Sequence, residues 1–329
     1  MAGYGFETEG NTIVSDFLSQ VKGRTFLITG PSQGGLGAET AISLAHGSPS
    51  TLILLGRNIP KIQPTIDSIH SVSPTTTVKF VSVSLDSLAS VRDAANAILS
   101  DPSIPNIDVI INNAAIMACP YALSTDGYEL QFATNHLSHF LLTNILLPKL
   151  HTSIPGQQAR IVNISSWGHV FSSVRFDDPN FHEGKEYLSW EGYGQSKTAN
   201  ILMAVALNSR FQESGNQSIK AFALHPGSIA SGLQKYVEGD PAVMKAALDT
   251  LKKWGQPMPT RKTLQQGCST TLRAALDPAL NDSEKIYLHD CQVKSDPGVV
   301  MEYALDKENA RKCWELSEKM VGEKFAIKN

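Results

Sequence analysis

Short apolar runs alternate with helix-like stretches along most of this chain, and that alternation restricts its fold more than any other feature. Each run is hydrophobic throughout, which is typical of strands buried on both faces. Strands of this kind belong to a parallel sheet that helices cover on both sides. Seven runs fit the pattern: 25–28, 51–55, 78–83, 107–111, 160–164, 220–224 and 285–288.

Helical patterns fill most of the intervals between these runs. We expect helices over 38–45, about 60–70, 87–99, 127–150 and 193–211. The sequence therefore predicts one α/β domain over residues 1–329, a doubly wound, Rossmann-type fold whose seven-stranded, mostly parallel sheet has helices on both faces. Two stretches, about 167–192 and 228–260, have no regular pattern. Both follow strands, where such folds bind ligands, so we expect them to be substrate loops.

Composition excludes several classes of protein. Hydrophobic residues make up 42% of the 329 residues, enough for a full core, and the net charge of −3 argues against a nucleic-acid partner. No apolar run approaches the ~18 residues of a membrane span, and the first 23 residues lack the plan of a signal peptide. The cysteines are widely spaced, which predicts reduced thiols in a cytoplasmic protein and no metal site. They are Cys119, Cys268, Cys291 and Cys313.

A glycine-rich segment joins the first run to the first helix. Residues 29–37 read TGPSQGGLG. Glycine allows a positive φ and a close approach of the backbone to a ligand, and a helix N-terminus attracts phosphate. The segment could be a plain turn, but its place after the first strand favours a dinucleotide site.

Arg57 follows the second run and bears on the choice of nucleotide. NAD sites place an acidic residue here to bind the ribose hydroxyls, whereas an arginine accommodates a 2′-phosphate. No Asp or Glu occurs between Thr51 and Gln63. We therefore predict NADP(H) as the cofactor, with a solvated surface charge as the alternative role of Arg57.

Tyr193 and Lys197 are four residues apart, so on a helix they share one face. A free tyrosine has a pKa near ~10, and a general acid or base works best near the ambient pH. Lowering that pKa by ~3 units takes about 4 kcal/mol, which a nearby ammonium can supply. The pair is also a frequent chance arrangement on helices.

Four further motifs accompany this pair: Asn112-Asn113-Ala114-Ala115 after the fourth run, Asn135 in FATNHL, Ser166 at the end of ISS, and HPG at 225–227 followed by Ile229 and Ser231. In this order, and together with the glycine-rich segment, they resemble the short-chain dehydrogenases/reductases over nearly the whole chain. The resemblance implies that Tyr193 donates a proton to a carbonyl oxygen that Ser166 binds. Lys197 would lower the tyrosine pKa and hold the nicotinamide ribose, and Asn135 would anchor a water linked to Lys197.

The same resemblance implies which residues bind the cofactor. They are Gly30, Ser32, Gly34, Gly35, Leu36, Gly37, Arg57, Ser84, Leu85, Asn113, Ala114, Tyr193, Lys197, Pro226, Gly227, Ile229 and Ser231. Three departures from the family pattern stand out. The two adjacent glycines leave open whether Gly34 or Gly35 approaches the pyrophosphate. Ser84 stands where the family usually has an acidic residue that binds adenine, and Asp86 follows two positions later. Ser231 stands where a threonine is commoner.

Within the family, segments 135–143 and 193–202 resemble retinol-dehydrogenase-like and protochlorophyllide-reductase-like members. So does the interval of 27 positions between Ser166 and Tyr193. Similar chains are common among fungal enzymes of secondary metabolism. Relatives often dimerise through their two long helices, here near 127–150 and 192–211, so a homodimer is one state to expect.

The leading functional hypothesis is an NADPH-dependent reductase of ketones or aldehydes, or the reverse alcohol oxidation, acting on a bulky apolar small molecule. Reduction of a C=C bond by the same Tyr and Lys is an alternative, and so is a catalytically silent NADP-binding regulator. Five side chains could line the substrate pocket or equally pack within loops. They are Trp167, Tyr187, Trp190, Trp254 and Met258.

Histidines are not expected to carry the chemistry. His136 and His139 fall in the long helix, where packing or solvation is the expected role. His169 and His225 are nearer the predicted site, but no spacing supports a metal-ligand role.

Overall fold

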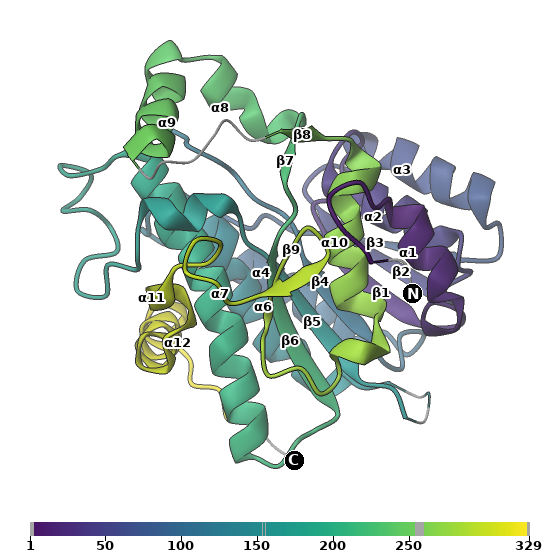
Figure 1. Ribbon diagram of the computed structural model, residues 1–329. Helices are drawn as coiled ribbons and strands as arrows, with labels where there is room; N and C mark the ends of the chain where they lie inside the picture. The colour runs from purple at the N-terminus through teal and green to yellow at the C-terminus, as the bar shows by residue number, and fades with distance from the viewer. Residues whose placement is uncertain (1–2, 153, 155, 254–259, 328–329) are drawn as a thin grey trace.

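The main sheet has eight strands in the order β10-β9-β6-β5-β4-β1-β2-β3 (Figure 1). The computed structural model describes residues 3–152, 154, 156–253 and 260–327. Every neighbouring pair in the sheet is parallel except β9 and β10. The strands are β1 (Thr25–Thr29), β2 (Thr51–Gly56), β3 (Thr77–Ser82), β4 (Val109–Asn112), β5 (Ala159–Ile164), β6 (Ile219–His225), β9 (Tyr287–His289) and β10 (Gln292–Lys294). The predicted fold class is confirmed.

The eighth strand, β10, was not predicted. It has three residues, lies at the edge of the sheet and is only half-buried. Its partner β9 is joined to it by a tight turn in which Asp290 and Cys291 have φ values of 48° and 58°. Short, half-polar edge strands carry no apolar run, so the pattern that revealed the other strands could not reveal this one.

The helices form two groups that cover the sheet. In one group α10 packs against α1 and α2, and α2 packs against α3; in the other, α4 packs against α6 and α12 against α7. Their bounds are α1 (Gly10–Asp16), α2 (Leu36–Ala45), α3 (Ile59–Val72), α4 (Leu88–Ser100), α5 (Leu130–Phe132), α6 (Ser138–Leu146), α7 (Ser189–Glu213), α8 (Lys235–Glu238), α9 (Pro241–Lys253), α10 (Leu264–Leu276), α11 (Glu302–Leu305) and α12 (Lys307–Val321).

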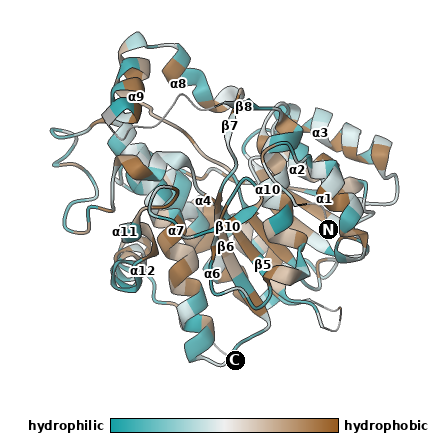
Figure 2. Cartoon of the chain, in the orientation of Figure 1, coloured by the Kyte–Doolittle hydropathy of each residue, from teal (hydrophilic) through white to brown (hydrophobic). Residues whose placement is uncertain are grey.

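The central strands are buried on both faces. All residues of β1, β4 and β5 are buried, and the middle of the sheet is hydrophobic in Figure 2. A strand without a solvent face has no reason to alternate polar and apolar residues. This explains why continuous apolar runs located the parallel strands correctly.

Two predicted stretches differ from the structure. The helix expected over 127–150 begins at Leu130 and contains a π-helical turn, η2 (Ala133–Leu137), before α6. The described part of the stretch 228–260, expected to be irregular, contains β7 (Ser228–Ile229) and the helices α8 and α9. Helix α9 begins with a proline at its first position and continues through good helix formers, a pattern that the sequence reading overlooked.

Helix α12 covers the outer side of α7. The Trp314 ring meets the Phe140 ring edge-on at 4.8 Å, and the Arg210 guanidinium lies 4.2 Å from its centroid. As a result α7 is buried on almost every side between Gly192 and Leu207. The homodimer stays a prediction, and the surface under α12 cannot contribute to it. In the described part of the chain, no helix is both long and apolar enough to cross a membrane.

Candidate active site

Strand order reverses between β1 and β4, which is where doubly wound folds bind ligands. The hydroxyl of Thr29, at the end of β1, accepts hydrogen bonds from the backbone amides of Asn113 and Ala114, both at 2.9 Å. The side-chain amide of Asn113 donates back to the Thr29 carbonyl at 2.9 Å. These bonds hold the two strand ends together at the predicted cofactor site.

Glycines let the loop after β1 pack against this junction. Gly30 has a φ of 69°, and a Cβ there would lie 2.9 Å from the Ala114 Cα. A Cβ on Gly37 would lie 2.5 Å from the Asn113 amide nitrogen and 2.6 Å from the Gly30 carbonyl oxygen. Gly34 has a φ of 75° with open space around it. The loop therefore needs glycine for clearance at two positions and for conformation at two.

The N-terminus of α2 has backbone donors available for an anion. Gly35 is its N-cap and supplies no side-chain acceptor, so the first amides of α2 have no capping side chain. A helix N-terminus beside a glycine-rich turn is a favourable place for a pyrophosphate. Of the two adjacent glycines, Gly34 makes the turn and Gly35 begins the helix. The residues present fit a dinucleotide.

Arg57 lies next to this loop. The Gly30 amide donates to the Leu55 carbonyl at 2.9 Å, which brings the end of β2 against the loop. The Arg57 side chain is exposed, and no hydrogen bond or ion pair to it is found among the described residues. At the end of β3, the Ser84 hydroxyl donates to the Asp86 carboxylate at 2.6 Å. The displaced acid therefore lies beside the serine that took its expected place.

Ser166 and Tyr193 meet where β5 ends. Ser166 caps the 3-10 helix η4 (Trp167–Phe171), its hydroxyl accepting from the Gly168 amide at 3.0 Å, and it lies close enough to Tyr193 to lower the pKa of the phenol. Tyr193 and Lys197 project from α7, with the Lys197 ammonium 5.6 Å from the tyrosine ring centroid. The ammonium donates to the Ile164 carbonyl at 3.0 Å. The structure thus brings three of the four predicted catalytic residues together.

Burial controls the electrostatics of these groups. Burial raises the pKa of Tyr193 to about 12, although the nearby Ser166 opposes the rise. Burial also lowers the pKa of Lys197 to about 7. Desolvation disfavours both ions, and its effect on Tyr193 is larger than any lowering of the tyrosine pKa by the nearby Lys197, so that predicted lowering stays a prediction. The favoured form of Tyr193 is the neutral phenol, which can donate a proton.

Asn135 lies one step behind this group, within the π-helical turn η2. Its side-chain oxygen accepts from the Ile116 amide at 2.8 Å, while its nitrogen donates to the Ile116 carbonyl and to the Ser196 hydroxyl, both at 2.9 Å. Ser196 in turn donates to the Tyr193 carbonyl at 2.7 Å. These contacts use both N–H groups of the amide, so a water predicted here would have to donate to the side-chain or backbone oxygen of Asn135.

His139 joins Asn135 to the cofactor junction. Its Nε2 is 2.9 Å from the Thr29 hydroxyl and its Nδ1 is 3.0 Å from the Asn135 carbonyl. Since a carbonyl can only accept, Nδ1 carries the proton and Nε2 accepts from Thr29. Burial lowers the pKa of His139 to about 4, so the ring is neutral. The histidine is packed, as expected, but it also links two parts of the site.

A cavity of about 560 Å³ lies beside Ser166. It is lined by Trp167, Val170, Pro297, Gly298, Met301, Glu302 and Tyr303. Trp167 was a predicted lining residue, whereas the wall at 297–303 was missed. The only signal for that wall was its position after the last strand of the sheet.

Two other predicted lining residues are not among those that line this cavity, although the Trp190 ring meets the Tyr193 ring edge-on at 6.0 Å. The Tyr187 hydroxyl donates to the Cys119 carbonyl at 2.9 Å, and its ring packs on Tyr121 inside a loop. Trp190 stacks on Phe171 at 5.0 Å, and its indole nitrogen donates to the Val243 carbonyl of α9 at 2.7 Å. Trp254 and Met258 lie outside the described residues.

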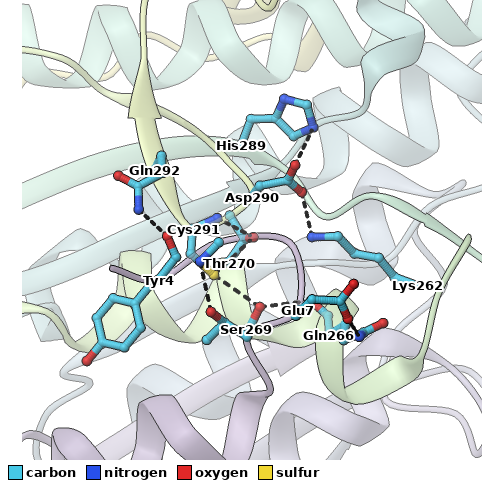
Figure 3. A network of polar contacts seen from close by, with 12 residues as sticks. Tyr4, Glu7, Lys262, Gln266, Ser269, Thr270, His289, Asp290, Cys291 and Gln292 are labelled. Carbon is cyan, nitrogen blue, oxygen red and sulfur yellow. Dashed lines mark hydrogen bonds and ion pairs between the residues drawn. The ribbon is translucent and has the colours of Figure 1, made fainter. Parts of the chain in front are cut away.

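The segment predicted to cover the nicotinamide is held from one side. Gly227 has a φ of 100°, and a Cβ there would lie 2.6 Å from the Lys262 side chain. Strand β7 pairs with β8 (Arg261–Lys262), and the buried Lys262 ammonium lies 2.6 Å from the Asp290 carboxylate (Figure 3). Ser231 caps the turn after β7 through the Leu233 amide. Pro226 and Ile229 belong to this anchored segment.

Comparisons with known proteins agree with this geometry. The profile of the family described as short chain dehydrogenase matches residues 24–176. The short-chain dehydrogenase/reductase prx1 of Penicillium rubens is 38% identical, over 93% of this chain and 87% of that protein. The chain belongs to the short-chain dehydrogenase/reductase family. Mouse retinol dehydrogenase 12 is 33% identical over 92% of this chain and 88% of its own length.

A solved structure also resembles this short-chain dehydrogenase/reductase. It is that of an uncharacterised protein from Mycobacterium paratuberculosis, with 30% identity and a TM-score of 0.69, covering 93% of this chain and 96% of that one. The resemblance to retinol-dehydrogenase-like members and to fungal proteins is confirmed.

Gly168→Ala tests the contact between η4 and the tyrosine. A Cβ at this position would lie 2.7 Å from the Tyr193 ring and 3.3 Å from the Ser166 hydroxyl. We expect turnover to fall by at least tenfold, because the ring must shift, while the affinity for cofactor changes little. Steady-state kinetics and cofactor titration measure the two effects. Gly5→Ala, whose Cβ meets nothing within 4 Å, is the control. Unchanged turnover in Gly168→Ala would contradict this packing argument.

Acid should destabilise the fold, because buried histidines resist protonation. Burial lowers the pKa of His136 to about 3 and that of His139 and His169 to about 4. An unfolded histidine has a pKa near ~6.5, so each costs about 2 kcal/mol of stability near pH ~5. Burial raises the pKa of Glu129 to about 7, which opposes the loss, by about 2.5 kcal/mol.

These four groups together give an expected loss of about 3 kcal/mol between pH ~7.5 and ~5, and the buried His225, whose pKa is also lowered, adds to it. Urea denaturation at the two pH values measures it. An equal or higher free energy of unfolding at the lower pH would show that these histidines do not stay neutral.

Proposed function

We propose that this chain is an NADPH-dependent oxidoreductase that reduces a ketone or aldehyde on a bulky, apolar small molecule, or oxidises the corresponding alcohol. Residues 1–329 act as one domain, and a role in fungal secondary metabolism, suggested by the resemblance, is part of the proposal. The observation that carries it is the position of the neutral, buried Tyr193 beside Ser166 and near an apolar cavity of about 560 Å³.

The roles of the side chains follow from their contacts. Ser166 offers a hydroxyl that can bind the substrate oxygen, and Tyr193 holds the proton that this oxygen receives. Lys197, with a pKa of about 7, can take up and release a proton at neutral pH behind the tyrosine. Asn135 fixes the segment at Ile116 and, through Ser196, the backbone of α7 at Tyr193.

The cofactor side supports NADP(H). NADPH, when bound, supplies the hydride. The uncapped α2 N-terminus and the glycine cradle would hold its pyrophosphate, and the exposed Arg57 would hold a 2′-phosphate. The apolar cavity walls favour a substrate with little polar surface.

The proposal is tested by following NADPH oxidation with a panel of bulky cyclic ketones, aldehydes and enones, with identification of the products. An alcohol product supports carbonyl reduction. A saturated ketone from an enone would instead identify a C=C reductase, and no NADPH oxidation with any member would favour a silent NADP-binding protein.

Tyr193→Phe should lower turnover by at least a thousandfold, because it removes the proton donor and keeps the ring that packs against Gly168. Cofactor affinity, measured by fluorescence titration with NADPH, should change by less than about threefold. Ser166→Ala is the companion variant and should lose about a hundredfold. Near-native turnover in Tyr193→Phe would refute the assignment.

Arg57→Ala should weaken the binding of NADPH but not that of NADH. Losing one charge-assisted contact to a phosphate costs about 2 kcal/mol, or roughly thirtyfold in kcat/KM for NADPH, with little change for NADH. Comparing the two cofactors at equal concentrations checks this, with the exposed Lys22→Ala as a control for surface charge. Wild-type protein that turned over faster with NADH would overturn the choice of NADPH.

A further inference from the structure

His169 follows Ser166 by three residues and has no part in the proton chemistry above. It is fully buried in η4. Its Nδ1 lies 2.7 Å from the Ser166 carbonyl oxygen, and its Nε2 lies 3.1 Å from the Met301 amide nitrogen. A carbonyl only accepts and an amide only donates, so Nδ1 carries the proton and Nε2 is the acceptor. The ring is therefore neutral and in one tautomer, and burial lowers its pKa to about 4.

These contacts join the two walls of the cavity. One wall is η4, with Trp167 and Val170, and the other is the C-terminal wall, residues 297–303. Two hydrogen bonds connect η4 to the C-terminal wall among the described residues, and both end on His169. The first is from the Met301 amide to the ring, and the second is from the Tyr303 hydroxyl to the His169 carbonyl at 2.7 Å.

Neighbouring side chains hold the histidine in place. The Tyr287 ring of β9 packs edge-on against the imidazole at 5.7 Å. The Thr198 hydroxyl, next to Lys197 on α7, lies 3.1 Å from the His169 carbonyl oxygen and 2.7 Å from that of Ser172. His169 therefore connects Ser166, α7 and the C-terminal wall through one residue whose ring cannot rotate freely.

We propose that His169 is a positioning residue that sets the enzyme's selectivity for bulky apolar carbonyl compounds, by fixing the C-terminal wall relative to Ser166. The proposal rests on the proposed function. A bulky substrate must touch both walls of the cavity, whereas a small one can be held by Ser166 and Tyr193 alone. Movement of the C-terminal wall should therefore weaken the binding of large substrates and leave the binding of small ones nearly unchanged.

Two substitutions separate the two hydrogen bonds of the ring. In His169→Asn, the shorter amide can still donate to the Ser166 carbonyl but cannot reach Met301. In His169→Gln, the longer side chain can accept from the Met301 amide but loses the bond to Ser166. A merely structural histidine would make both variants lose stability without changing selectivity.

The first measurement is kcat/KM for a bulky cyclic ketone and for a small aldehyde. His169→Asn should lower the ratio of the two values by about tenfold, mainly through KM of the bulky ketone. His169→Gln should keep the ratio and lower kcat for both substrates. The control is His136→Asn, because His136 is equally buried but its Nε2 contacts Ser317 of α12 and not the cavity. It should leave the ratio unchanged.

The second measurement does not depend on activity. Hydrogen exchange, followed by mass spectrometry on peptides covering 297–305, should become faster in His169→Asn and stay near wild type in His169→Gln. Folded His169→Asn with unchanged selectivity and unchanged exchange would overturn the proposal. If the wild-type protein reduced no carbonyl compound, the proposed function would fail, while the exchange pattern would still decide whether His169 positions the wall.

Discussion

The close contact between α7 and η4 is the constraint on which the rest of the site depends. A Cβ on Gly168 would meet the Tyr193 ring at 2.7 Å, and one on Gly194 would lie 2.7 Å from the Ser172 amide nitrogen. With hydrogen at both positions, the turn after β5 lies directly on the helix that follows it. Ser166 and Tyr193, 27 residues apart, can then lie close enough for the serine to lower the pKa of the phenol. Cofactor and substrate have to be arranged around that contact.

A second constraint is that the site buries ionisable groups in their neutral forms. Desolvation raises the pKa of Tyr193 to about 12 and lowers that of Lys197 to about 7. The same effect keeps His139 and His169 neutral, and each then has a fixed donor nitrogen and a fixed acceptor nitrogen. Neutral groups of fixed direction can bridge segments that charged groups could join only at a large desolvation cost. Burial thus fixes the hydrogen-bond geometry of these groups but makes the fold less stable at low pH.

The sequence predicted the sheet well because its central strands have no exposed face, so composition alone marks them. The residues that its short motifs named also lie near one another, at the strand ends and at the start of α7. The sequence failed where structure depends on distant contacts. The bond between His169 and Met301 joins residues 132 positions apart, and no local pattern records it. The sequence shows a lysine near Tyr193 but not the burial of both groups, so it could not predict that burial raises the tyrosine pKa.

The two sides of the candidate active site therefore differ in how far apart in the sequence their residues lie. The side that would carry out chemistry is built from short motifs at the ends of β1, β4, β5 and β6, together with Asn135 in η2 and with Tyr193 and Lys197 on α7. The cavity wall at 297–303 is remote in sequence from η4 and is tied to it by the two hydrogen bonds to His169, while α9 is tied to the start of α7 through Trp190. Trp190 binds the Val243 carbonyl of α9 and stacks on Phe171, while His169 binds the C-terminal wall. Both ties end on η4 or on the start of α7, beside Ser166 and Tyr193, so a shift of either remote segment would act on the site through these elements.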